Sequence, residues 1–217
     1  MFFYWLNHIS TASILIPCII GAVRFTKIPN LYQPFLYFIW LGSLNELISM
    51  ILVNTQHPNL VNSNMYVLLE YALILFIFFR WNDAKNRSRY NLLFLTGLGI
   101  WILENLVINS LQTINAVFRV FYAFIVLYLS INQVNMLIVS EKKRLISNTI
   151  FLCCLSFIFY FSYKAFIETF YILHPPFSKP FYVHLFMILL SINFFTNLVY
   201  AIAILCIPTR REFIIPC

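Results

Sequence analysis

The stretch LGSLNELISMILVN, residues 41–54, is apolar enough to lie in a bilayer, yet it carries Asn45 and Glu46 side by side. A carboxylate at the centre of a membrane helix costs roughly 2.5–3.5 kcal/mol, and the cost falls toward the interfaces. Such a residue usually faces the interior of a helix bundle and has a partner there. Two later apolar segments repeat the feature, with Glu70 in YVLLEYALILFIFF and Glu104 in WILENLVI. We therefore predict helices arranged around three glutamates.

The composition of the whole chain is that of a membrane protein. Of 217 residues, 62% are hydrophobic and only 10% are charged, whereas soluble domains contain about 25% charged residues. The net charge of +7 does not predict a nucleic-acid partner, because the basic residues lie mainly in short connections between apolar segments. We expect the lipid bilayer itself to be the main partner and no nucleic acid to be bound.

The chain divides into seven apolar segments. The first precedes every positive charge, unlike a secretory signal peptide, whose basic residues come before its apolar run. We therefore expect an uncleaved first helix, kinked by Pro17, which a membrane helix tolerates. The predicted helices are residues 2–23, 33–54, 64–80, 91–109, 116–139, 145–166 and 181–207.

The basic residues predict how the chain crosses the membrane. Eleven lie at one set of helix ends, namely Arg24, Lys27, Arg80, Lys85, Arg87, Arg89, Lys142, Lys143, Arg144, Arg210 and Arg211. Three remain elsewhere, Arg119, Lys164 and Lys179. The positive-inside rule then puts the N-terminus outside and the C-terminus in the cytoplasm. No connection is long enough for a soluble domain, so residues 1–217 are predicted to form a single all-α transmembrane bundle of seven helices.

This topology assigns a depth to each polar side chain. Glu46 comes eight residues before the outer end of its helix, which is about 12 Å at 1.5 Å per residue. Nearly every other ionisable group within the predicted helices also falls in the outer third. The candidate site residues are Asn45, Glu46, Glu70, Glu104, Arg119, Lys164, His8 and His184, with Glu168 at the outer end of the sixth helix.

Two interpretations of this layer stay open. The glutamates could pair with Arg119, Lys164 and backbone groups and only lock helices together, but interhelical polar contacts contribute just about 0.6 kcal/mol on average. Alternatively, the charges line a cavity that opens to the outside. Arg119 is the expected counter-charge of the layer. Because acids exceed bases, we expect one glutamate, the deep Glu46, to be protonated near neutral pH.

A milder polar group is predicted toward the cytoplasm. It consists of Asn132, Gln133 and Asn135 on the fifth helix, with Asn193 and Asn197 on the seventh. We interpret it as a structural set of interhelical hydrogen bonds. The basic loops are expected to meet anionic lipid headgroups.

The motifs of several membrane enzymes do not occur in the sequence. It contains no H-E-x-x-H and no G-x-S-x-G, and its one aspartate, Asp83, falls in a predicted cytoplasmic loop. A metal set of glutamates and a histidine is chemically possible, but the spacing matches no known motif. With only four glycines, a phosphate-binding loop is excluded. We expect no catalytic residue, no metal site and no cofactor.

The pattern of Asn45-Glu46, Asn62, Asn64, Tyr66 and Glu70-Tyr71 resembles small seven-helix membrane proteins of Bacteroidota-type bacteria. That resemblance covers most of the chain in layout. It implies a multi-pass protein of the bacterial cytoplasmic (inner) membrane and a signalling role beside sensor kinases, and it transfers no catalytic residue. The plan of seven helices is also similar to that of receptor and rhodopsin-like proteins, by architecture alone.

These observations lead to one functional hypothesis and two alternatives. We expect a non-enzymatic, receptor-like or sensory protein. A small ligand or ion would enter the outer cavity, and the basic loops would contact a separate cytoplasmic signalling partner. A small proton-coupled transporter is the first alternative, and an intramembrane enzyme that uses buried glutamates is the second.

Overall fold

The computed structural model describes residues 2–82, 84, 86–140, 145–173 and 175–208, which form helices and short connections without a strand. Two short 3₁₀ turns, η1 (Phe25–Lys27) and η3 (Leu145–Ser147), accompany the helices. In chain order the long elements are α1 Phe2–Ser13, α2 Leu15–Arg24, α3 Gln33–Asn54, α4 Leu60–Trp81, α5 Arg87–Ile102, the π-helix η2 Leu103–Ile108, α6 Ala116–Ser140, α7 Thr149–Leu173 and α8 Lys179–Cys206.

Within the described ranges, seven stretches are long and apolar enough to cross a membrane. They coincide with the seven predicted segments, so the prediction of an all-α protein with seven long apolar helices is confirmed. α1 and α2 together make the first stretch. The helix is interrupted between them because Pro17 has no N–H to continue the helical hydrogen bonds. α5 and η2 together make the fourth.

The sixth predicted helix differs most from the structure. α7 begins at Thr149, because the side chain of Asn148 accepts a hydrogen bond from the Phe151 N–H, 3.1 Å away, and caps the helix there. It then continues to Leu173, past the predicted end at residue 166. Lys164 and Glu168 are therefore buried inside a helix and do not mark its end.

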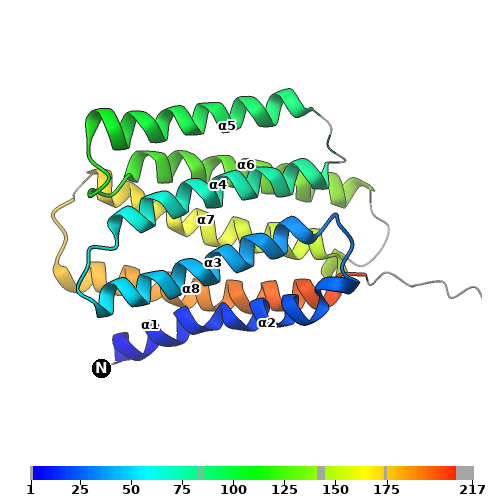
Figure 1. Ribbon diagram of the computed structural model, residues 1–217, viewed down its shortest axis with the longest axis horizontal. Coiled ribbons are helices and arrows are strands. Elements are labelled where there is room, and N and C mark those ends of the chain that lie inside the picture. The colour runs from blue at the N-terminus through cyan, green and yellow to red at the C-terminus, as the bar shows by residue number, and fades with distance from the viewer. Residues whose placement is uncertain (1, 83, 85, 141–144, 174, 209–217) are drawn as a thin grey trace, which may run out of the picture.

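The helices pack side by side in an elongated bundle (Figure 1). α8 contacts α1, α2 and α7, α7 contacts α6, and α3 contacts α4. The centre is aromatic: the rings of Phe38, Phe157 and Tyr200 pack with centroids 5.7–5.9 Å apart. Such contacts hold three helices together through apolar burial and ring geometry.

The bundle has two ends, visible at the left and right of Figure 1. The N-terminal end is where α1 begins and where the α3–α4, η2–α6 and α7–α8 connections lie. The C-terminal end is where α8 ends. Arg24, Lys27, Arg80, Arg87 and Arg89 lie at the C-terminal end. The other six basic residues of the predicted inner group, Lys85, Lys142, Lys143, Arg144, Arg210 and Arg211, lie outside the described residues.

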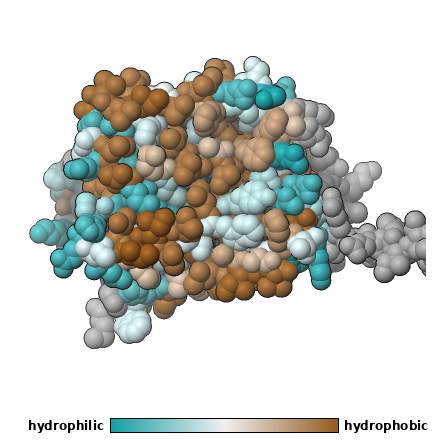
Figure 2. Space-filling model, viewed as in Figure 1, coloured by the Kyte–Doolittle hydropathy of each residue, from teal (hydrophilic) through white to brown (hydrophobic). Residues whose placement is uncertain are grey.

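The surface of the bundle is largely apolar. Hydrophobic residues cover much of the face in Figure 2, and hydrophilic residues gather toward the two ends. Large side chains such as Val23 (75% exposed) and Leu106 (61%) point away from the protein. Apolar exposure on this scale is unusual for a soluble monomer. Together with the seven apolar helices, it supports a multi-pass membrane protein.

Candidate functional site

The candidate site begins on one face of α3 and α4. Tyr66 and Glu70 are four residues apart on α4 and share a face, so the Tyr66 hydroxyl donates a 2.9 Å hydrogen bond to Glu70 Oε1. Gly42 of α3 lies opposite. A Cβ at Gly42 would come 2.8 Å from Ile14 Cδ1 and 3.6 Å from the Tyr66 hydroxyl. Glycine at this position therefore allows the α1–α2 junction to approach α3.

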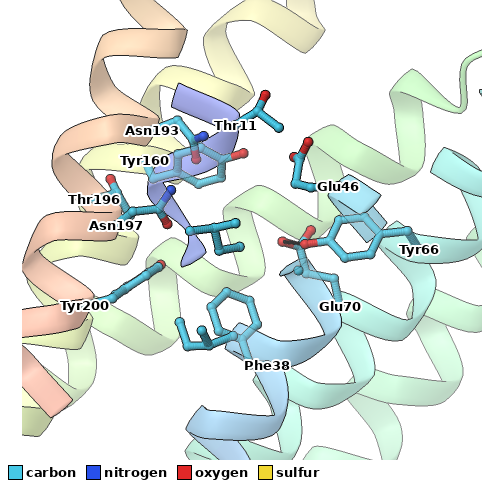
Figure 3. Close-up of a pocket in the computed structure, with 13 residues that line it drawn as sticks. Thr11, Phe38, Glu46, Tyr66, Glu70, Tyr160, Asn193, Thr196, Asn197 and Tyr200 are labelled. Carbon is cyan, nitrogen blue, oxygen red and sulfur yellow. Dashed lines mark hydrogen bonds between the residues drawn. The ribbon is translucent and has the colours of Figure 1, made fainter. Parts of the chain in front are cut away.

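A first cavity of about 90 Å³ lies between α1, α3, α4, α7 and α8. Figure 3 shows Glu46, Tyr66 and Glu70 on one side of it, across from polar side chains of α1, α7 and α8. The facing polar residues are Thr11, Tyr160, Asn193, Thr196 and Asn197. A cavity of this size and polarity has room for a few water molecules or a small ion.

Glu46 is half-buried at the edge of the first cavity. No hydrogen bond or ion pair joins its carboxyl group to any residue in the described part of the chain. Burying an ionised carboxylate without a partner is costly. At the first cavity, the Glu46 carboxyl group is thus free to meet a proton, a cation or a ligand.

The first cavity has an aromatic floor toward the C-terminal end. Phe38 and Tyr200 line the cavity, and Phe157 packs against both rings. Phe35 adds a further ring 5.4 Å from Tyr200. These aromatic side chains separate the polar half of the bundle from its C-terminal half.

The wall formed by α8 is held by hydrogen bonds to α1. Asn193 Nδ2 donates to Ser10 Oγ at 3.0 Å, and Asn197 Nδ2 donates to Ser13 Oγ at 2.8 Å. The predicted interhelical hydrogen bonds of Asn193 and Asn197 are confirmed, but their partners lie on α1 and not among the α6 amides. Asn132 and Asn135 are exposed on α6. Asn193 and Asn197 are four residues apart on α8, and Ser10 and Ser13 are three residues apart on α1. Residues at either spacing lie on one face of a helix, so the two pairs can meet across the α1–α8 contact.

Lys164 connects α7 to Glu70. Its ammonium lies 3.4 Å from Glu70 Oε2, and the side chains of both residues are buried. The same ammonium lies 5.2–5.6 Å from the ring centroids of Tyr122, Tyr160 and Phe161. Cation–π contacts of this kind partly replace the hydration that the buried ammonium has lost.

Arg119 binds partners on three elements. Its Nε donates to Asn115 Oδ1 (2.7 Å), and its second guanidinium nitrogen, Nη2, donates to Ser63 Oγ (2.8 Å) and Asn64 Oδ1 (3.2 Å). The first, Nη1, faces Glu168 Oε1 at 3.7 Å. The acid beside Arg119 is thus Glu168 of α7. This correction replaces the expectation that Arg119 balances Glu46, Glu70 and Glu104.

A second cavity of about 310 Å³ adjoins these charges. It is lined by Arg119, Lys164 and Glu168, together with polar and apolar residues of α3, α4, α7 and α8. Tyr66 and Tyr160 line both cavities. Since Glu70 lines the first cavity and Lys164 the second, their ion pair links the two spaces.

Glu104 lies apart from both cavities and caps a helix. Its two carboxyl oxygens accept the N–H groups of Val117 (3.0 Å) and Phe118 (2.7 Å), which belong to the first turn of α6. Helix N-termini favour negative charge at that position. The π-helix η2, in which the Asn109 N–H bonds the Glu104 carbonyl, places the side chain there. Glu104 thus has a structural role as the cap of α6, which was one of the two interpretations of the glutamates left open by the sequence.

The other predicted site residues are distributed as follows. Asn45 accepts a hydrogen bond from Asn62 Nδ2 (3.0 Å) and lines the second cavity. His184 is exposed on α8, with Nδ1 2.6 Å from the Pro180 carbonyl. His8 is half-buried on α1. Neither histidine lines either cavity.

Sequence reasoning missed four contributors to the site, Tyr66, Tyr160, Thr11 and Thr196. Tyrosine and threonine carry no charge, so a search for ionisable groups within apolar segments passes over them. The four-residue spacing of Tyr66 and Glu70 was a usable signal. No sequence signal placed Tyr160 at the cavity, because its position there depends on how α7 is rotated about its axis.

No group of three or more His, Cys, Asp or Glu side chains that could hold a metal ion occurs among the described residues. No protein-family model, curated protein or solved structure matches the chain. The site is therefore interpreted from its own geometry.

Proposed function

We propose that this chain is a receptor-like or sensory integral membrane protein. Its polar cavities would bind a small ligand or ion from the outside, and a separate cytoplasmic partner would read the response at the basic C-terminal end. The bacterial inner membrane and the outward N-terminus belong to the same proposal. The observation that carries it is Glu46, a carboxyl group at cavity depth without a hydrogen-bond or ion-pair partner among the described residues.

The aromatic floor supports sensing over transport. A transporter needs a polar path that can open to either side of the membrane. Here Phe38, Phe157 and Tyr200 close the first cavity toward the C-terminal end. A site that is closed by aromatic rings toward the basic end of the bundle is suited to binding a ligand and transmitting its presence.

Cysteine accessibility in intact cells tests the proposal. In a background with Cys18, Cys153, Cys154, Cys206 and Cys217 replaced by alanine, single variants Glu46→Cys and Ala203→Cys are treated with a small, membrane-impermeant, cationic thiol reagent. We expect modification at position 46 and none at position 203, which is fully buried on α8. A position 46 that stays unmodified in a folded protein would mean a dry contact, and the proposal would fail.

Proteoliposomes loaded with a pH-sensitive dye separate the sensor from the transporter. We expect no proton movement above that of empty liposomes when a pH gradient is imposed. A proton flux that Glu46→Gln abolishes would favour the transporter, in which the Glu46 carboxyl group would carry the transported proton.

A further inference from the structure

The second cavity brings charges of both signs together around one partly open space. Arg119 and Lys164 supply two positive charges, and Glu168 and the Glu70 carboxyl behind Lys164 supply two negative charges. The described charges around this space therefore sum to zero. A ligand with a net charge would bring an uncompensated charge into a low-dielectric site, which is costly.

Glu168 is incompletely satisfied. The residue is 8% exposed, and its Oε2 atom is buried with no hydrogen-bond partner in the described structure. Its other oxygen lies 3.7 Å from Arg119 Nη1, which is beyond ordinary hydrogen-bond length of about 3.2 Å. A buried carboxylate oxygen without a donor is costly, so the site favours a donor group entering the cavity.

Two of the three guanidinium nitrogens of Arg119 donate hydrogen bonds that hold the side chain in place, and the third is available to a ligand. Its Nε and Nη2 atoms donate to neutral acceptors at Asn115, Ser63 and Asn64. Among the described residues, its Nη1 atom makes no hydrogen bond and has only the stretched contact to Glu168. Guanidinium groups bind carboxylates well because their donors are planar and fixed. Nη1 is therefore the atom that a ligand carboxylate would reach.

The cavity is small and its remaining walls are mostly apolar. Its volume of about 310 Å³ is at the lower end of the range for ligand pockets, roughly 300–1,000 Å³. Ile114, Ile167, Phe186 and Leu189 face it from two helices and one connection. These walls suit a short apolar side chain.

Resting on the proposed function, we propose that the second cavity binds a small zwitterion of the α-amino-acid type. The ligand carboxylate would bind Arg119, and its ammonium group would donate to Glu168. One stretched ion pair would then be replaced by two close pairs, with no change in net charge. Tyr66 and Tyr160, shared with the first cavity, would transmit occupancy to Glu46.

Binding to the purified full chain in nanodiscs tests this. The probes are glycine, L-alanine, L-leucine and L-phenylalanine, followed through thermal stability and calorimetry. For leucine, 4-methylpentanoate lacks the ammonium group and 3-methylbutylamine lacks the carboxylate. We expect at least one amino acid to bind and to raise the melting temperature with concentration. We expect each of its single-charge analogues to bind at least tenfold more weakly. Equal binding of the carboxylate analogue, or no binding by any of the four amino acids, would overturn the proposal.

Variants identify the residue that contacts the ammonium group. Glu168→Gln should weaken amino-acid binding at least tenfold and at the same time strengthen the binding of 4-methylpentanoate, because the site then carries a net positive charge; a purely structural role would weaken both. Lys179→Gln, which neutralises an exposed charge at the same end, should match the wild type. If Glu168→Gln does not fold, Leu189→Trp decides, because it fills the cavity and leaves every charge in place. Binding that survives Leu189→Trp would place the ligand elsewhere.

This experiment and the cysteine test fail independently. If the thiol reagent reaches position 46 but no amino acid binds, the zwitterion inference fails and the sensory proposal stands. If position 46 is sealed, the sensory proposal fails, whatever the calorimetry shows.

Discussion

Four buried or half-buried carboxyl groups lie within the polar half of the bundle, and three of them have partners. Glu70 lies beside the Lys164 ammonium, Glu168 beside Arg119, and Glu104 on two backbone N–H groups. Each arrangement lowers the cost of keeping a carboxylate away from water. Glu46 lacks a hydrogen-bond or ion-pair partner within the described residues, so its charge state should respond most directly to whatever enters the cavity.

We expect Glu46 to carry a proton at pH 7 in the absence of ligand. No cation of the described residues pairs with it, whereas Glu70 and Glu168 each lie beside a cation and Glu104 accepts two backbone N–H groups. Infrared difference spectra of the purified protein should then contain a protonated-carboxyl C=O band that disappears in Glu46→Gln and persists in Glu104→Gln. A spectrum without such a band at pH 7 would mean that all four carboxyl groups are ionised, and the layer would then be better explained as a structural lock.

Arg119→Ala should be the most destabilising charge removal in the polar half. It leaves Glu168 uncompensated and breaks hydrogen bonds to Asn115, Ser63 and Asn64. Breaking one partner of a buried pair costs about 3–5 kcal/mol. Chemical denaturation in detergent should show this loss, while Lys179→Ala changes little. Adding Glu168→Gln should recover part of the loss and adding Glu70→Gln should not. Equal recovery by both would contradict the assigned pairing.

At the scale of elements, one glycine allows α5 to approach α4 closely. The ring of Tyr71 occupies the space where a Cβ of Gly97 would stand, and its hydroxyl donates to the Leu93 carbonyl at 2.6 Å. This close approach helps to hold α5 to the bundle, together with its contacts to α6 and the hydrogen bond from Trp101 Nε1 to the Asn64 carbonyl at 2.9 Å.

Gly97→Ala should therefore destabilise the protein by about 1–3 kcal/mol, the usual cost of overpacking a filled contact. The chain offers a matched control two residues away. No atom would lie within 4 Å of a Cβ at Gly99, so Gly99→Ala should be neutral or stabilising by up to about 1 kcal/mol, as helix propensity dictates. Melting temperatures of the two variants measured in the same detergent test this. The assigned α4–α5 contact would be wrong if both alanines had the same effect.

The sequence predicted the number, type and approximate bounds of the helices because hydropathy decides those. It also predicted that Glu46, Glu70, Arg119 and Lys164 share one end of the bundle, because depth follows from position along a helix. It could not predict which charge meets which. The Arg119–Glu168 pair depends on how α6 and α7 are rotated about their axes, and the Glu104 cap depends on a π-helix that shifts its side chain. Both are decided by packing and not by local pattern.

At the scale of the whole molecule, the two ends of the bundle differ in what they bury. The N-terminal end contains both cavities and their buried ion pairs. Toward the C-terminal end the interior is mostly aromatic and aliphatic, with Phe35, Phe78 and Ile204 fully buried and a few buried polar residues such as Thr149. Exposed basic side chains such as Arg87 and Arg89 lie at its rim. The proposed division between binding at one end and signalling at the other follows this difference.

The end of the bundle that carries the basic residues should face the cytoplasm. Cytoplasmic ends of membrane helices carry an excess of Lys and Arg, so the α4–α5 connection should face the cytoplasm and the η2–α6 connection the outside. Gln112 and Ser88 are exposed in or beside these two connections, which makes them suitable for single cysteines in the cysteine-free background. A membrane-impermeant thiol reagent applied to intact cells should modify Gln112→Cys at once. It should modify Ser88→Cys only after the membrane is permeabilised. The reverse pattern would invert the bundle and open the cavities to the cytoplasm, in which case neither the sensory proposal nor the zwitterion site could report on the cell's surroundings.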